Sequence, residues 1–119
     1  MSQNLKMAYV IFAMVIGMAS KRSKACDISP KVRNEVLGRD NCQCIICGEK
    51  HNLQIAHYVS RARLGLGIPQ NLATMCLSCH FQYDNGKYHK EIKEAFREYL
   101  KAHYDNWNEQ ELTYKKWRF

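Results

Sequence analysis

The stretch that decides the fold begins with Cys44-Ile45-Ile46-Cys47-Gly48 and ends with Cys76-Leu77-Ser78-Cys79-His80. Each end of the stretch carries a Cys-x-x-Cys pair. Two such pairs suit a tetrahedral zinc ion, because each short turn directs two sulfur atoms to one point. The sequence therefore predicts a structural zinc site with four ligands, Cys44, Cys47, Cys76 and Cys79. The wide gap between the pairs indicates that further structure is inserted between the two turns.

The chain has 119 residues, a length that suits one domain with a small apolar core. Domains of this size often need a staple such as a bound metal ion. Lysine and arginine number 18 against 11 acidic residues, which gives a formal net charge of +7. This excess favours an anionic partner, most simply the phosphates of nucleic acid, although ordinary solubility explains it equally well.

The six cysteines fit either disulfides in a secreted protein or zinc ligands in an intracellular one. The paired spacing favours zinc. Cys26 and Cys42 are then left over, and we expect them to be free thiols in a reducing compartment. Cys42 also forms a Cys-x-Cys pattern with Cys44, which leaves a second ligand register open, but Gly48 suits the tight turn of a zinc knuckle after Cys47.

Residues 7–19 form an apolar run without charge. The run is shorter than the ~20 residues that span a bilayer, but it has the length of a signal-peptide core. Export would place paired thiols in an oxidising space, and Met18 begins a basic segment that is itself typical of a protein start. We therefore expect residues 1–18 to be an N-terminal extension, residues 19–119 to be one domain, and no stable membrane association.

Local patterns predict the elements of this domain. Residues 19–28 are basic and are expected to be mostly structureless, either a solvated tail or a phosphate-binding arm. Ser29 before Pro30 is typical of a helix start, and Gly38 can end that helix. Alternating apolar residues predict a strand over 53–59, and the glycines that follow predict a flexible loop over 61–69.

Further helices are expected in the second half. Leu72, Met75, Cys76 and Cys79 recur at helical spacing and predict a helix from Asn71 to the Asn85-Gly86 stop. Residues 87–104 carry the clearest amphipathic pattern. Asn106 and Glu109 resemble a capping box that begins a last short helix.

Three polar residues between and beside the cysteine pairs stand out, and each has an ordinary explanation when taken singly. His57 is a satisfied strand histidine or an additional zinc ligand, and Asn71 is a turn or cap residue. His80 follows Cys79 directly and lies one helical turn after Cys76, so it is a rival zinc ligand. Their joint order changes this balance.

The order Cys-x-x-Cys-Gly, Ala-His, Asn-Leu, Cys-x-x-Cys-His resembles the HNH endonuclease family in its zinc-stapled form. The segments Ile55-Ala56-His57-Tyr58-Val59-Ser60-Arg61, Gly65-Leu66-Gly67-Ile68, Asn71-Leu72 and Cys79-His80-Phe81-Gln82-Tyr83-Asp84-Asn85-Gly86 look like bacteriophage and prophage members. The resemblance covers about residues 19–119.

This resemblance implies an α+β fold with a ββα-metal core, in which a β-hairpin and a helix hold one divalent metal beside a zinc knuckle and flanking helices. It implies hydrolysis of DNA phosphodiester bonds, DNA as the partner, and the cytoplasm of a bacterial host. It also assigns roles to His57 as the general base, Asn71 as the residue that orients the loop and that histidine, and His80 as a ligand of catalytic Mg²⁺ or Mn²⁺.

Other residues are expected to complete the site. Asp84, one turn after His80, is the expected second metal ligand, since such ions prefer oxygen donors. Arg61 or Arg63 is expected to hold a phosphate. Many family members carry a further ligand just before the general base, and here that position is Ala56. The small number of expected ligands to the catalytic metal keeps two alternatives open: a non-catalytic zinc DNA-binding module, and a zinc-stabilised interaction protein. The sequence leaves the oligomeric state open.

Overall fold

The computed structural model describes residues 21–115, and residues 1–20 and 116–119 are not described, so the prediction for residues 1–18 lies outside it. No helix within the described part is long and apolar enough to cross a membrane. The elements follow one another as α2 (Lys21–Cys26), α3 (Pro30–Arg39), β1 (Leu53–His57), η1 (Arg61–Arg63), η2 (Pro69–Asn71), β2 (Leu72–Cys76), α4 (Leu77–Asn85), α5 (His89–His103) and η3 (Glu109–Glu111).

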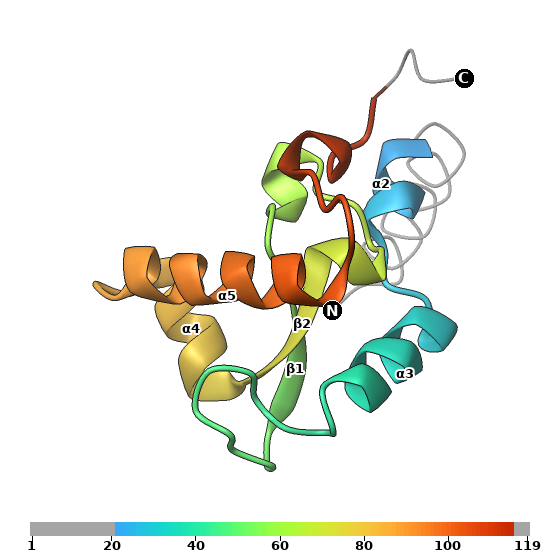
Figure 1. Cartoon of the computed structure of the whole chain (residues 1–119). Helices are drawn as coiled ribbons and strands as arrows, with labels where there is room; N and C mark the ends of the chain where they lie inside the picture. The colour runs from blue at the N-terminus through green and yellow to red at the C-terminus, as the bar shows by residue number, and fades with distance from the viewer. Residues whose placement is uncertain (1–20, 116–119) are drawn as a thin grey trace, which may run out of the picture.

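The centre of the fold is an antiparallel pair of strands followed directly by a helix (Figure 1). Leu53 pairs with Cys76 at one end of the hairpin, and His57 pairs with Leu72 at the other. Cys76 ends β2 and is also the N-cap of α4, where its sulfur accepts a hydrogen bond from the N–H of Cys79. The result is a small mixed fold of helices around a two-stranded sheet.

The sequence predicts a helix that begins at Asn71. This prediction is wrong for residues 72–76, which form β2, and the helix begins only at Leu77. Every residue of β2 is buried. A strand that is covered on both faces reads as a continuous apolar run, and periodicity alone does not separate such a run from a helix. The predicted stop at Asn85 and Gly86 is confirmed.

Smaller departures occur at other element ends. Lys21–Cys26 is helical, whereas this segment was expected to be mostly structureless. Ser29 caps α3 as expected, but the helix continues past Gly38 to Arg39. The last turn is capped by Asn108, whose side chain accepts a hydrogen bond from Gln110 N–H, and not by Asn106. The strand predicted over 53–59 ends at His57.

Two apolar clusters cover the two faces of the hairpin. On one face Ala56, Ala73 and Met75 pack with Phe96 and Leu100 of α5. On the other face Ile55 and Leu72 pack with Val36 of α3. Side chains alternate between the faces of a strand, which is why neighbours in sequence belong to different clusters. In Figure 1, α5 runs across the hairpin, and α3 and α4 lie to opposite sides of it.

A buried ion pair ties α3 to the rest of the fold. Arg39 binds the Asp40 carboxylate through Nε and Nη2, at 2.7 and 3.0 Å, and Nη2 also donates to the carbonyl of Leu72 at 2.7 Å. Asp40 also accepts hydrogen bonds from the N–H of Thr74 and the hydroxyl of Tyr99. The pair therefore joins α3, β2 and α5 by polar contacts beneath the apolar clusters.

The electrostatics of Asp40 make this junction depend on pH. Burial raises the pKa of the Asp40 carboxyl, but the hydrogen bonds from Arg39, Tyr99 and Thr74 outweigh burial, so the pKa lies below its ordinary value. A carboxylate with a lowered folded-state pKa stabilises the fold above the unfolded-state pKa. That contribution is lost as the pH falls through the lowered value.

We predict that Asp40→Ala lowers the free energy of unfolding by about 3–5 kcal/mol, because it leaves the buried guanidinium of Arg39 without its counter-ion. Denaturant unfolding of the zinc-loaded protein measures the loss. Glu35→Ala on the exposed side of the same helix is the control and should change stability by less than about 0.5 kcal/mol. Equal stability of the two variants would contradict the role given to the ion pair.

Candidate functional site

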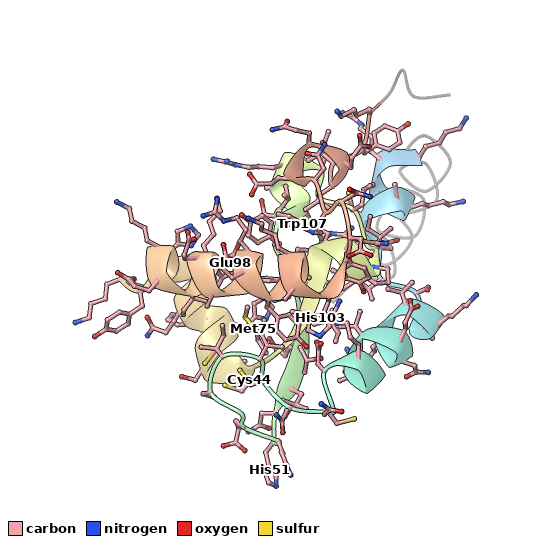
Figure 2. All side chains as sticks on the ribbon, in the orientation of Figure 1. Cys44, His51, Met75, Glu98, His103 and Trp107 are labelled. Atoms are coloured by element: carbon pink, nitrogen blue, oxygen red, sulfur yellow. The ribbon has the colours of Figure 1, made fainter. Side chains whose placement is uncertain are left out.

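The four cysteines predicted as zinc ligands converge. The sulfur atoms of Cys44, Cys47, Cys76 and Cys79 lie within 4.8 Å of one another, and Figure 2 shows several sulfur atoms gathered around the labelled Cys44. Cys47 Sγ and Cys76 Sγ are 3.6 Å apart. Zinc–sulfur bonds of about 2.3 Å place the sulfurs of a tetrahedral site about 3.8 Å apart, so this geometry fits one zinc ion.

Local backbone geometry holds the sulfurs in place. Gly48 adopts a φ of 80°, which an L side chain rarely tolerates, and its N–H closes the first turn by donating to the carbonyl of Cys44 at 2.9 Å. The N–H of Ile46 points at the sulfur of Cys44 from 3.4 Å. The glycine expected after Cys47 is therefore required by the turn itself.

The thiols do not ionise alike. Burial opposes ionisation of Cys44, but hydrogen bonds from the backbone N–H groups of Cys47, Cys76 and Ile46 lower its pKa to about 7. Burial, followed by its cysteine neighbours, raises the pKa of Cys79 well above the ordinary thiol range. Four thiolates at this separation repel one another, so the cluster ionises fully only around a cation.

Position separates the four-cysteine cluster from the other candidate zinc ligands. Within residues 21–115, the four cysteines form the only group of three or more histidine, cysteine or acidic side chains that could hold a metal ion together. His57 and His80 do not belong to it. Cys42 is exposed and Cys26 is buried, and both are free cysteines outside the cluster.

His57 is the last residue of β1 and faces α2. Its Nε2 lies 3.0 Å from the backbone carbonyl of Cys26, the last residue of α2. A carbonyl oxygen only accepts hydrogen bonds, so Nε2 carries the proton and Nδ1 is the nitrogen left with a free lone pair. The structure thereby fixes one tautomer of this histidine.

The pKa of His57 lies below its ordinary value. Burial is the largest cause, since it disfavours the charged ring; the hydrogen bond to Cys26 acts in the opposite direction, and the charges of Arg61 and His80 lower the pKa further. Asp84 raises it slightly. His80 and Asp84 thus lie close enough to His57 to act on its charge, although the side chain of His57 leaves β1 on the face opposite Gln54.

His80 forms a pair with Asp84 on the exposed side of α4. His80 Nε2 lies 3.3 Å from Asp84 Oδ2, one helical turn away. Its other ring nitrogen, Nδ1, donates to the side-chain oxygen of Gln54 on β1 at 2.7 Å. A metal-binding histidine usually donates its second N–H to such an oxygen, which orients the ring. One nitrogen and one carboxylate are therefore available to a divalent metal at this position.

Asn71 lies fully buried at the start of β2 and holds the loop that follows β1. Its amide oxygen accepts from Val59 N–H at 2.8 Å, and its amide nitrogen donates to the carbonyls of Val59 and Leu66 at 3.1 and 2.8 Å. The backbone carbonyl of Asn71 also accepts from Tyr58 N–H at 2.7 Å. These bonds fix the chain directly after His57, while a catalytic role for Asn71 stays a prediction.

The loop of residues 61–69 begins with the 3-10 turn η1, ends where η2 begins, and packs closely on its neighbours. A side chain at Gly65 would meet the carbonyl oxygen of Val59 at 1.7 Å, and one at Gly67 would meet that of Asp27 at 2.0 Å. Glycine at both positions is therefore required by close backbone contact. The N–H of Gly67 donates to the carbonyl of Ala25, which attaches the loop to α2.

The two arginines predicted to hold phosphate differ in their partners. Arg61 donates to the carbonyl of Cys26 at 2.9 Å and forms an ion pair with Asp27 at 2.8 Å. The side chain of Arg63 is exposed and has no ion pair with any residue of the described range 21–115. The structure therefore gives Arg61 a structural partner and leaves Arg63 open to solvent.

Sequence reasoning missed two groups of this site. Gln54 is an exposed strand residue whose only hint is the alternation that places it opposite His57. The carbonyl of Cys26 carries no side-chain signal at all, and it lies 31 positions before the histidine that it binds. Both contacts exist only because the hairpin brings distant segments together.

No known family model matches this chain, and no curated protein matches its sequence. Among solved structures, its fold is similar to the Type IV phosphorothioation-dependent restriction endonuclease ScoMcrA, with 20% sequence identity and a TM-score of 0.53. The match covers 63% of this chain and 19% of the endonuclease chain. At this identity the similarity concerns the fold, and this chain corresponds to a small part of the larger enzyme.

We predict that the purified protein contains about one equivalent of zinc and that Cys47→Ser or Cys76→Ser loses both the metal and the folded structure, because zinc binding supplies folding free energy in sites of this kind. Elemental analysis and circular dichroism provide the measurements. Cys42→Ser, a free and exposed cysteine outside the cluster, is the control and should retain zinc. A Cys76→Ser variant with full zinc content would refute the assigned ligand set.

Proposed function

We propose that this protein is a metal-dependent DNA endonuclease of the HNH type that hydrolyses phosphodiester bonds. The observation that carries the proposal is the environment of His57: a half-buried ring with one fixed tautomer, one free nitrogen and a lowered pKa, close to the His80 and Asp84 pair. Perturbed histidines beside other titratable groups are typical of catalytic sites. The similarity in fold to a restriction endonuclease supports the same class.

His57 would act as the general base. The hydrogen bond from Nε2 to the carbonyl of Cys26 leaves Nδ1 to take a proton from the attacking water. The lowered pKa keeps the ring neutral, and therefore able to accept a proton, at neutral pH. Asn71 would act as a positioning residue, because its hydrogen bonds fix the backbone directly after His57.

His80 Nε2 and the carboxylate of Asp84 would hold Mg²⁺ or Mn²⁺, whose chemistry is to stabilise negative charge on the scissile phosphate and the leaving oxygen. Gln54 would orient the His80 ring through its hydrogen bond to Nδ1. The zinc cluster would serve this site only indirectly, since Cys76 and Cys79 fix the first turn of α4, on which His80 lies. The free thiols Cys26 and Cys42 suit the reducing cytoplasm of a bacterial host.

A second candidate is a zinc-stabilised DNA-binding module without catalysis. One observation favours it: within residues 21–115 the His80 and Asp84 pair is not part of any group of three potential metal ligands. Ala56, at the position of a ligand in many HNH sequences, is fully buried in the apolar cluster. Cleavage assays separate the two candidates.

We predict that His57→Ala lowers the rate of metal-dependent plasmid nicking by about 10²–10⁴-fold, the usual contribution of a general base, while affinity for DNA is retained. His51→Ala is the matched control, because His51 lies at the exposed tip of the loop before β1 (Figure 2) and should leave nicking unchanged. If the wild-type protein nicks DNA with neither Mg²⁺, Mn²⁺ nor Ni²⁺ yet binds it, the DNA-binding module is the correct function.

The pH dependence of nicking provides a separate prediction. Because burial lowers the pKa of His57, kcat/KM should rise with pH along a limb that lies below the ordinary histidine value of about 6.5 and should then stay level through neutral pH. Arg61→Gln removes a positive charge that lowers this pKa, so the limb should move to higher pH. A limb that Arg61→Gln leaves in place would argue against His57 as the titrating base.

A further inference from the structure

A hollow of about 340 Å³ opens beside the candidate active site. Asp84, the residue paired with His80, belongs to its wall, which is built from segments far apart in the sequence. The polar and charged groups in the wall are Ser60, Arg63, Asp84, His89, Lys93 and Glu109. The loop after β1, the end of α4, the beginning of α5 and the turn η3 all contribute.

The two cations of this wall have no acidic partner among the described residues. Neither Arg63 nor Lys93 forms an ion pair with a residue in the range 21–115, whereas Arg61 is paired with Asp27. The ammonium of Lys93 lies 5.7 Å from the ring centre of Tyr58, which also lines the hollow. Lys93 is half-buried, and its cation–π contact with Tyr58 keeps its charge beside the hollow.

The hydroxyl of Ser60 is a further donor of the wall. Ser60 precedes η1, and its side chain makes no capping hydrogen bond. His89 already uses its Nδ1 proton to donate to the carbonyl of Tyr83 and is not counted among these donors. A guanidinium, an ammonium and a hydroxyl thus line one small hollow, and together they suit the oxygens of a phosphate group.

The two acidic groups of the wall already have partners. Glu109 accepts a hydrogen bond from the Tyr58 hydroxyl, and Asp84 is paired with His80. Under the proposed function Asp84 also faces the metal. Both carboxylates are thus engaged by other groups, whereas no acidic side chain of residues 21–115 forms an ion pair with Arg63 or Lys93.

We propose that this hollow is a phosphate subsite, which binds a backbone phosphate of the DNA strand next to the phosphate at His80 and Asp84. The inference rests on the proposed function for its substrate, and it deepens that function by assigning Lys93 and Ser60 to DNA contact beside Arg63. A second phosphate contact adds sequence-independent affinity for the strand, in the ground state and in the transition state alike.

The test is the salt dependence of DNA binding, measured by fluorescence anisotropy with a short labelled DNA duplex in a His57→Ala background, where nicking does not interfere. Each phosphate contact contributes about 0.9 to the slope of log K against log salt concentration. Arg63→Gln and Lys93→Gln should each lower the slope by about 1. The charge-retaining changes Arg63→Lys and Lys93→Arg should preserve most of it.

Lys101→Gln is the matched control, since Lys101 lies on α5, is exposed and does not line the hollow. It should leave the slope unchanged. Slopes for Arg63→Gln and Lys93→Gln that equal the slope for Lys101→Gln would overturn the subsite. Arg63 is exposed and without an ion pair in the described range, so its variant tests the proposal even if Lys93→Gln fails to fold.

Two further measurements separate this inference from the proposed function. In the nicking-competent protein, Arg63→Gln and Lys93→Gln should raise KM while changing kcat little, because a subsite contributes to ground state and transition state alike. Nicking by the wild type with unchanged slopes would keep the endonuclease and overturn the subsite. If Arg63→Gln and Lys93→Gln reduce the slope but the wild type does not nick DNA, the subsite is retained and the protein is a DNA-binding module without catalysis.

The source of the phosphate is tested with a second probe. Inorganic phosphate is added in sulfate-free buffer at constant ionic strength. It should displace the duplex only weakly, because the DNA strand contacts the His80 and Asp84 pair and the hollow together. Full displacement by low concentrations of inorganic phosphate, with equal affinity for Arg63→Gln and the parent, would show that the hollow does not hold DNA and would overturn the proposal.

Discussion

The convergence of four sulfur atoms on one point is the constraint on which the rest of this structure depends. Cys76 is at once the last residue of β2, the cap of α4 and a member of the sulfur cluster. The cluster therefore fixes where the strand ends and in which direction the helix leaves. His80 lies on the first turn of that helix and Asp84 one turn further on, so their position relative to β1 follows from the sulfur geometry. A chain of this size has little apolar core with which to fix such an angle otherwise.

The His57 side of the candidate site depends on α2. The carbonyl of Cys26 accepts hydrogen bonds from both His57 and Arg61, and Gly67 donates to the neighbouring carbonyl of Ala25. The free carbonyl groups at the end of a helix are thereby used to orient a histidine and a loop. This contact explains how a segment that is basic and short of apolar residues is nevertheless ordered, and why it belongs to the site.

The charges of the protein fall into two classes that net charge does not distinguish. Arg39 and Arg61 have acidic partners, Asp40 and Asp27, whereas Arg63 and Lys93 face a hollow without a counter-ion in the described range. The formal charge of +7 indicated only that an anionic partner was favoured. Which cations are available to such a partner is decided by tertiary contacts, because these contacts determine which cations already have an acidic neighbour.

The sequence by itself determined the two cysteine pairs of the cluster, the start of α3 at Ser29 and the buried face of α5, because each pair or pattern consists of residues that are close in the chain. It did not determine that residues 72–76 form a strand, since burial on both faces removes the alternation by which strands are recognised. The tautomer of His57, the orientation of His80 by Gln54 and the hollow at Lys93 were likewise decided only by the tertiary structure. In each case the partner is a backbone carbonyl or a side chain from a distant segment, and local pattern carries no information about a contact that folding alone creates.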